Sequence, residues 1–409
     1  MTTTATGTRG LSRVEFIGLI AALMALNALA IDVMLPALPY MGEALSIANE
    51  NDRQLVLSMY LFGFGITQLA FGPLSDRYGR RAPLLLGLIV YLVAAFAAVF
   101  SPNFAVLLGL RFVQGMGAAG TRVIAQSVVR DCFAGRAMAE VMSLVFMVFM
   151  VMPIIAPGIG QVLLMTGPWW TIFLFMGGLA TIISLWAFIR LPETLSDENR
   201  RPLTVKVVSE GFIIVFTNRV AISYAMAGTF LFGGLFGFIN ASQQIYVGIY
   251  DLGALFPIAF AAMASVMAFS SYLNSRVVGR FGMRRISHLA LIIFTGGGAA
   301  LWGVSLLGPM SLWMFFAFLA VVMFMFGWAA SNMNSLSMEP LGKVAGTASA
   351  VFGFVQTVGG ALLGLIIGRM YDGTLTPIAA GYMAMGALAI VCVLIAEKGK
   401  LFGVGSEYD

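Results

Sequence analysis

The chain has 409 residues, of which 60% are hydrophobic and only 10% are charged. Soluble domains carry about 25% charged residues, so this composition excludes a water-soluble globule and favours a polytopic helical membrane protein. The net charge of +5 does not indicate nucleic-acid binding, because the basic residues follow the connections between apolar segments.

The apolar segments predict twelve membrane helices of about 20 residues each. In the first half we place them at 16–38, 54–74, 83–100, 104–129, 137–164 and 169–189. In the second half we place them at 220–243, 255–274, 286–306, 312–335, 345–370 and 377–396. We interpret the polar stretch 190–219 as a cytoplasmic linker between an N-terminal six-helix bundle (1–189) and a C-terminal six-helix bundle (220–409).

The basic residues indicate which side of the membrane each connection occupies. Of the 23 lysines and arginines, most lie near the termini or in the even-numbered connections. Only Arg53 and Arg369 fall on the other side, and Arg111 and Arg122 lie inside the fourth predicted helix. The positive-inside rule therefore predicts that both termini of this multi-pass membrane protein are cytoplasmic.

A short charged connection at 72–81 reads Gly-Pro-Leu-Ser-Asp-Arg-Tyr-Gly-Arg-Arg. Its glycines permit a tight turn, and Asp76 is surrounded by arginines that can bind its carboxylate. We expect Asp76, Arg80 and Asp131 to meet at the cytoplasmic ends of helices 2 and 4. The string resembles the signature G-x-L-x-D-R-x-G-R-R between helices 2 and 3 of the major facilitator superfamily.

Part of this connection recurs in the second half of the chain. Arg77-Tyr78-Gly79 returns as Arg280-Phe281-Gly282 at an offset of 203 residues, with Gly279 in place of Asp76. Two six-helix halves related by duplication indicate a transporter whose site lies between the halves near the middle of the membrane.

Three ionisable residues lie well inside predicted spans, where charges are costly and mark function. Asp32 and Arg111 are each about 10 Å from the periplasmic end of their helices. They could therefore form a pair, which would be either functional or a structural link between two helices. Arg122 is expected on the same face of helix 4 as Arg111, and either lies in the substrate path or pairs with Glu140.

Two further motifs favour proton-coupled export. The sequence Arg111-Phe112-Val113-Gln114-Gly115 resembles the R-x-x-Q-G signature of proton-coupled members of the superfamily. Residues 153–160, with two prolines and two glycines, predict a kink and a close helix contact. They resemble the antiporter signature of helix 5 in its A-P-x-x-G form, although Gln161 replaces the last glycine.

Together, the segment Ile31–Pro39, the charged connection, Arg111 and Arg130-Asp131 resemble the bicyclomycin/chloramphenicol-resistance (Bcr/CflA) branch of drug–proton antiporters. The resemblance covers the first half best. It implies an all-α major facilitator fold of 12 transmembrane helices and export driven by inward proton flow. It further implies apolar or amphipathic drugs such as phenicols as substrates, protons as the coupling ion without a cofactor or metal, and a monomer.

The candidate site residues fall into two groups. Those expected to bind substrate are mainly methionine, aromatic and amide side chains, which can repack around varied ligands, although such stripes also serve helix packing and lipid contact. They are Met24, Asn27, Ala28, Asp32, Tyr60, Phe64, Arg111, Gln114, Arg122, Met142, Phe146, Met150, Asn240, Gln243, Gln244, Asn332 and Gln356. Those expected to control conformation are Gly72, Asp76, Arg77, Gly79, Arg80, Arg81, Asp131, Pro153, Pro157 and Gly160.

We therefore predict a proton-coupled small-molecule efflux antiporter that works by alternating access. Asp32 would carry the proton, and its protonation would weaken its hold on Arg111 or on substrate. The alternative is export of an amino acid, sugar or other metabolite by the same mechanism. An uptake symporter fits the helix 5 motif less well. A membrane enzyme is disfavoured because His288 and one intramembrane carboxylate provide neither a metal site nor an acid–base pair.

Overall fold

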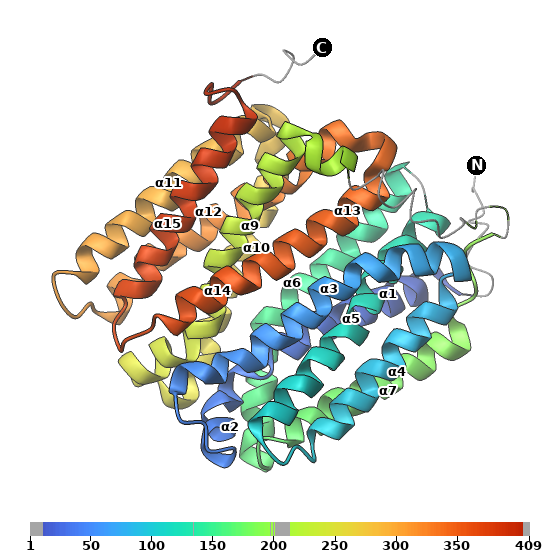
Figure 1. Cartoon of the computed structure of the whole chain (residues 1–409), viewed down its shortest axis with the longest axis horizontal. Helices are drawn as coiled ribbons and strands as arrows, with labels where there is room; N and C mark the ends of the chain where they lie inside the picture. The colour runs from blue at the N-terminus through green and yellow to red at the C-terminus, as the bar shows by residue number, and fades with distance from the viewer. Residues whose placement is uncertain (1–10, 134, 197, 199, 201–212, 404–409) are drawn as a thin grey trace. The chain divides into compact units, whose positions relative to one another are not determined.

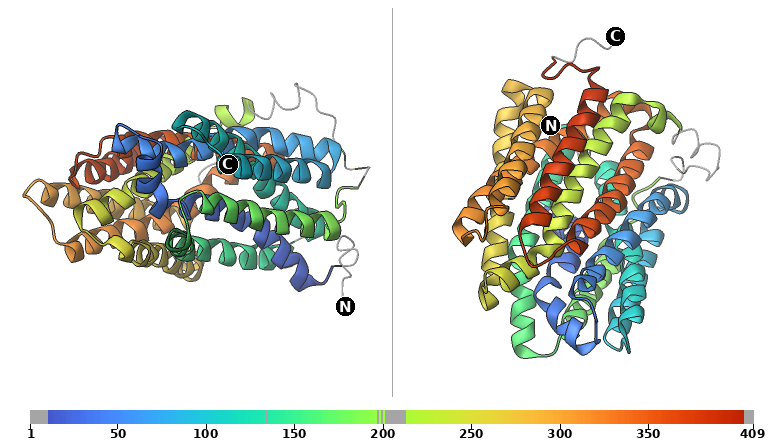
Figure 2. Two further views of the ribbon diagram at one scale, coloured as in Figure 1. Left: turned by 90° about the horizontal axis from the view of Figure 1, so that it is seen from below. Right: turned by 60° about the vertical axis from the view of Figure 1, so that its left-hand side comes forward.

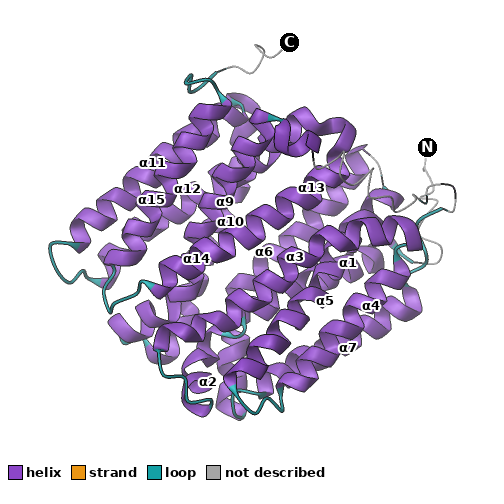
Figure 3. Ribbon diagram, viewed as in Figure 1, coloured by secondary structure: helices purple, strands orange, loops and turns teal. Residues whose placement is uncertain are grey.

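A computed structural model describes residues 11–133, 135–196, 198, 200 and 213–403 of the chain. The described residues form helices joined by short loops (Figure 3). Twelve helices in this part of the chain are long and apolar enough to cross a membrane. The prediction of twelve membrane helices is therefore confirmed.

The helices are labelled in Figure 1 in chain order. In the first half they are α1 (Arg13–Asp32), α2 (Leu38–Ala44), α3 (Leu55–Tyr78), α4 (Arg81–Ala98), α5 (Phe104–Cys132), α6 (Gly135–Thr166) and α7 (Thr171–Arg190). In the second half they are α9 (Arg219–Gln243), α10 (Phe256–Phe281), α11 (Met283–Ser305), α12 (Leu312–Met338), α13 (Ala345–Phe354), α14 (Gly360–Arg369) and α15 (Thr376–Ala396).

Two predicted helices are interrupted in the structure. The first predicted helix is not continuous, because α1 ends at Asp32 and a short 3₁₀ turn at Leu35–Ala37 precedes α2. Pro36 and Pro39 explain this break, since proline cannot donate the backbone hydrogen bond that a helix interior requires. The eleventh predicted helix contains a π-helical turn at Val355–Gly359, which separates α13 from α14.

The chain divides into two compact units, Met1–Val207 and Val208–Asp409. The polar stretch 190–219 contains this boundary. Residues 197, 199 and 201–212 of that stretch lie outside the described part, and 213–217 are helical. Its role as a linker between two bundles remains a prediction.

The same pattern of helix pairs occurs in both units. In unit 1 (Met1–Val207), α5 packs against α3 and α4, α1 packs against α6, and α4 packs against α7. In unit 2 (Val208–Asp409), α12 packs against α10 and α11, α9 against α14, and α11 against α15. The helices of each unit can be followed by their colour in Figures 1 and 2. The repeated pairing supports the duplication that the sequence indicates.

Glycines bring the backbones of α3 and α5 into direct contact. A Cβ atom added at Gly115 would collide with the carbonyl oxygen of Tyr60, and one added at Gly63 would collide with that of Phe112. Close approach of this kind is how small residues pack helices in membranes. It fixes the depth of α5 relative to α3, and therefore the position of Arg111.

We expect Gly115→Ala to destabilise the protein, because the backbone of Tyr60 cannot move away without shifting α3. Overpacking of this kind costs about 1–3 kcal/mol, which should appear as a lower midpoint of thermal unfolding in detergent. Gly109→Ala is the matched control, because no atom lies within 4 Å of a Cβ at this exposed position of the same helix. Equal midpoints for the two variants would contradict the contact.

Candidate substrate and proton site

Arg111 lies on α5 and is completely buried. Its Nε donates to the carbonyl oxygen of Val56 at 3.1 Å, and its Nη2 donates to that of Ala30 at 2.9 Å. Its Nη1 donates to Oε1 of Gln114 at 2.7 Å, one turn along α5. The guanidinium also lies over the ring of Tyr60, 4.5 Å from its centroid. One side chain thus ties together α1, α3 and α5.

The bond to Ala30 has a clear structural role. Ala30 is close to the C-terminal end of α1, where backbone carbonyls have no partner inside the helix. A cation near a helix C-terminus is also favoured by the helix dipole. Arg111 therefore stabilises the end of α1 beside Asp32. Its described partners are neutral oxygens and an aromatic face.

Asp32 is the last residue of α1 and is 4% exposed. In the part of the chain that the structure describes, its carboxylate has no hydrogen bond or ion pair. The pair with Arg111 that the sequence allows is therefore not formed here. The next residue is held against α6, because a Cβ at Gly160 would collide with the carbonyl oxygen of Val33. Asp32 thus lies where α1, α5 and α6 converge.

A buried chain of hydrogen bonds runs across the same three helices as the Arg111 contacts. Tyr60 donates its hydroxyl to Oδ1 of Asn27 at 3.3 Å, and Nδ2 of Asn27 donates to Oγ1 of Thr121 at 2.9 Å. Thr121 in turn donates to the carbonyl oxygen of Ala118 at 2.8 Å. The candidate residues Asn27 and Tyr60 are therefore joined, and Thr121 is a member of this chain that the sequence analysis missed.

Arg122 lies about three turns beyond Arg111 on α5 and is half-buried. Its guanidinium lies over the ring of Phe64, 5.8 Å from the centroid. Glu140, the structural partner considered for it, instead pairs with Arg13 at 2.7 Å. The structure therefore does not support the Glu140 alternative, and a role of Arg122 in the substrate path remains a prediction.

The other candidate residues differ in how closely they are packed. In unit 1, Met24 and Ala28 are buried, Met142 and Met150 are half-buried, and the side chain of Phe146 lies outside the described part. In unit 2, Asn240, Gln243, Gln244 and Asn332 are buried, and Gln356 is half-buried. Asn332 donates to Oδ1 of Asn274 and to the carbonyl oxygen of Trp328, each at 2.8 Å, which links α12 to α10. Whether these residues contact substrate remains a prediction.

The charged connection between α3 and α4 forms the cluster that the sequence predicts. Arg80 Nε donates to Asp131 at 2.7 Å, and its Nη1 donates to Asp76 at 2.6 Å and to Ser75 Oγ at 2.9 Å. Burial alone would lower the pKa of Arg80, but hydrogen bonds and charges from Asp131 and Asp76 outweigh burial and raise the pKa above its ordinary value. The predicted meeting of Asp76, Arg80 and Asp131 is confirmed.

The remaining residues of this connection have distinct environments. Gly79 has a φ of +88°, a conformation that favours glycine, and ends α3. Arg77 is exposed and stacks on Tyr78, whereas Arg81 contacts the ring and the carbonyl oxygen of Phe188 at the end of α7. Gly72, the first glycine of the connection, lies within α3.

Glu193 also binds the charged connection between α3 and α4, although the sequence placed it only in the predicted linker. Its Oε1 accepts from the backbone N–H of Arg80 at 2.8 Å and of Leu195 at 3.0 Å. Its Oε2 accepts from the backbone N–H of Arg81 at 3.1 Å. The neighbouring Thr194 donates to Asp131 at 3.2 Å. A carboxylate therefore occupies the N-terminus of α4, where free N–H groups and the helix dipole favour an anion.

No group of three or more His, Cys, Asp or Glu side chains that could hold a metal ion occurs among the described residues. The site therefore consists of one partnerless buried carboxylate, a buried arginine network, and a charged cluster at one end of α3, α4 and α5. Such an arrangement can bind a proton and can respond to conformational change.

Comparison with known proteins identifies similar chains. The family model described as Major Facilitator Superfamily matches residues 20–364. A bicyclomycin resistance protein homolog from Haemophilus influenzae is 30% identical over 380 residues, which is 93% of this chain and 94% of the relative. A chloramphenicol resistance protein from Pseudomonas aeruginosa is 29% identical, covering 90% of this chain and 88% of the relative. Multidrug resistance protein D from Escherichia coli is 27% identical, covering 93% and 95%.

Solved structures share the fold at low sequence identity. The crystal structure of a D-xylose–proton symporter matches with a TM-score of 0.71 at 14% identity, covering 95% of this chain and 100% of the other. A bacterial homolog of the human lysosomal transporter Spinster, in an inward-facing and unoccupied conformation, matches with a TM-score of 0.70 at 16% identity, covering 95% and 96%.

The contact of Glu193 with α4 can be tested by amide hydrogen exchange. Loss of a side chain that caps a helix costs roughly 1 kcal/mol, so we expect Glu193→Ala to speed exchange in a peptide that covers Arg80 and Arg81. Glu198→Ala is the control, because Glu198 is an exposed acid only five residues further along the chain. Unchanged exchange in the Glu193 variant would show that the carboxylate does not hold the helix end.

Proposed function

Because the chain belongs to the major facilitator superfamily, we propose that it exports apolar or amphipathic small molecules, such as phenicol antibiotics, in exchange for protons. It is a transporter and not an enzyme. Relatives that span nearly its whole length are named for resistance to bicyclomycin, to chloramphenicol or to several drugs. These names support a drug as the substrate.

The partnerless carboxylate of Asp32 is the observation that carries the proposal of proton coupling. The buried acids in the described part of the chain are Asp32 and Glu397. Glu397 accepts hydrogen bonds from Tyr224 and Arg284. Asp32 has no such partner, and a buried charge without one is costly. Protonation removes this cost, so Asp32 is the group in unit 1 best suited to gain and lose a proton.

Arg111 supports this role without taking part in the titration. Its guanidinium stays protonated at accessible pH, and its bond to Ala30 holds the last turn of α1 in place. Asp32 can therefore change its charge while its backbone remains fixed. A substrate that approaches Asp32 competes with the proton for the same group, which couples the two ligands.

Substrate would be recognised mainly by shape and apolar contact. Met24, Tyr60 and Phe64 supply apolar and aromatic surface in unit 1, and the amides of Asn27 and Gln114 supply polar groups. Such a lining tolerates varied ligands. Protons serve as the coupling ion, and no cofactor is required. The Arg80 cluster would stabilise one conformational state, because it joins the ends of α3 and α5 through charges that a helix shift would separate.

We also propose a monomer in the bacterial inner membrane with both termini in the cytoplasm. The distribution of arginine and lysine supports this orientation. In this orientation the Arg80 cluster lies on the cytoplasmic side and Asp32 lies nearer the periplasmic ends of the helices.

We expect Asp32→Asn to abolish proton-driven export of electroneutral drugs while leaving the protein folded, because asparagine keeps the shape and removes the titration. Measurement of drug-induced proton release from purified protein across about pH 5 to 9 should show release in the wild type and none in the variant. Asp251→Asn is the control, since Asp251 is exposed and its positive φ of 50° suits asparagine.

Proton release by Asp32→Asn equal to that of the wild type would place the coupling group elsewhere. A screen of wild-type protein against phenicols, amino acids and sugars in the same assay separates drug export from metabolite export. Release by a metabolite alone would replace the proposed substrate class.

The orientation predicts which sites an impermeant thiol reagent reaches in intact cells. In a chain with Cys132 and Cys392 replaced by serine, Leu307→Cys should be labelled from outside, because Leu307 is 87% exposed and lies in an odd-numbered connection. Ser196→Cys, in the polar stretch after α7, should be labelled only after the membrane is opened. The reverse pattern would invert the topology.

A further inference from the structure

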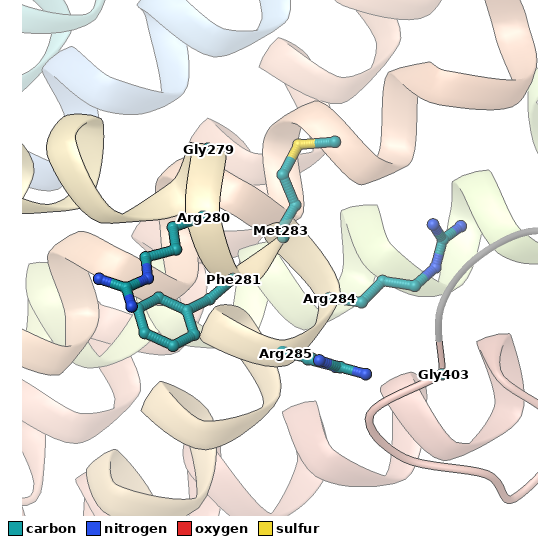
Figure 4. Close-up of a pocket in the computed structure, with 8 residues that line it drawn as sticks. Gly279, Arg280, Phe281, Met283, Arg284, Arg285 and Gly403 are labelled. Carbon is teal, nitrogen blue, oxygen red and sulfur yellow. The ribbon is translucent and has the colours of Figure 1, made fainter.

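A pocket with three arginines lies where α10 meets α11 in unit 2. Its cavity volume is about 420 Å³, and it is lined by residues 279–285 and by Gly403. Arg284 and Arg285 extend on the side of Gly403, while Arg280 lies on the other side beside Phe281 (Figure 4). No acidic residue is among those that line it. Since α10 and α11 are both candidate membrane spans, the pocket lies at their membrane boundary.

The equivalent loop of unit 1 shows that the helix N-terminus after such a turn can bind an anion. Gly79 ends α3 with a φ of +88°, and Gly282 ends α10 with a φ of +83°, so the two loops share a turn conformation. In unit 1 the helix that follows the turn holds the carboxylate of Glu193 on its first backbone N–H groups. In unit 2 the helix that follows, α11, begins after Gly282, which has no side chain that could cap it, and the first residues of α11 line the pocket. The same structural element thus binds an anion in one unit and faces an open pocket in the other.

The positive charge of this pocket is only partly neutralised. Arg284 donates to Glu339 at 2.9 Å and to Glu397 at 3.1 Å. Arg280 stacks on the ring of Phe281 at 5.6 Å. Arg285 is exposed, and no ion pair of Arg280 or Arg285 is recorded among the described residues. An anion placed at the N-terminus of α11 would therefore meet uncompensated guanidinium charge and the positive end of the helix dipole.

We propose that this pocket binds the phosphate of an anionic phospholipid headgroup. Arginine and helix N-termini are the common protein partners of phosphate. Phe281 is 52% exposed and, with Met283, gives the pocket an apolar wall beside its charges. That combination fits an amphiphile better than free phosphate, and basic pockets between membrane helices are known to hold such headgroups.

The proposal does not depend on drug export, so its test reads lipid binding directly. Full-length protein in detergent would be titrated with phosphatidylglycerol or phosphatidylcholine, and bound lipid counted by native mass spectrometry. We expect preferential binding of phosphatidylglycerol, weakened on the order of fivefold by Arg285→Gln. Arg280→Gln, whose side chain lies on the other side of the pocket, should have a smaller effect. Arg130→Gln is the matched control, because it removes an exposed arginine of unit 1.

Two other occupants are outcomes of the same experiment. If phosphatidylglycerol binding is the same for Arg285→Gln as for the wild type, the lipid proposal fails. Binding of millimolar inorganic phosphate to the wild type would then show that the site takes free phosphate. The chain beyond Gly403 includes Glu407 and Asp409. If the wild type binds no phosphatidylglycerol but the full-length variant with Glu407→Gln and Asp409→Asn does, the chain's own C-terminus is the anion. Equal binding of both lipids would also overturn the proposal.

Discussion

The structure of unit 1 depends on one constraint, which is that a polar group left without a partner inside a bilayer is costly. Arg111 meets this constraint for itself and for two helices at once. It donates to Ala30 near the end of α1 and to Val56 near the start of α3. These bonds require the close contact of α3 and α5 that Gly63 and Gly115 allow. The close packing of α3 and α5 and the hydrogen bonds of Arg111 therefore depend on each other, and both help to position Asp32.

Much of the fold could be predicted from the sequence, because the relevant signals are local. The length of each apolar segment marks the spans, and proline explains the break after Asp32. The cluster of Asp76, Arg80 and Asp131 was also predictable, since few charged partners occur at that end of the helices.

The partners of Arg111 and Glu193 could not be predicted in the same way. Arg111 binds backbone carbonyl oxygens, which every residue carries and which leave no mark in the sequence. Counting residues gave Asp32 and Arg111 similar depths, but depth does not determine the direction in which a side chain points. Glu193 is one of several acids in a polar stretch, and its spacing alone does not select it as the partner of α4.

The two units show how a duplicated element can diverge while its backbone is kept. Both have a positive-φ glycine between two membrane helices, at Gly79 and at Gly282. Unit 1 adds an acid, Asp76, which binds the buried Arg80, whereas unit 2 has Gly279 at the corresponding position. In unit 2 the buried carboxylate of Glu397 binds Arg284 and Tyr224 instead. The ion pairs of the two units therefore join different helices, and the two loops need not respond alike to conformational change.

The contact between Glu193 and α4 holds the residues that follow α7 against unit 1. Helix α7 ends at Arg190, but the next five residues are drawn back to unit 1 by the bonds of Glu193, Thr194 and Leu195. At full extension five residues span about 17 Å. That length is unavailable to the connection between the units while the bonds persist. Release of Glu193 would free these residues and the N-terminus of α4 at the same moment, so the length of chain available between the units and the state of the charged connection would change together.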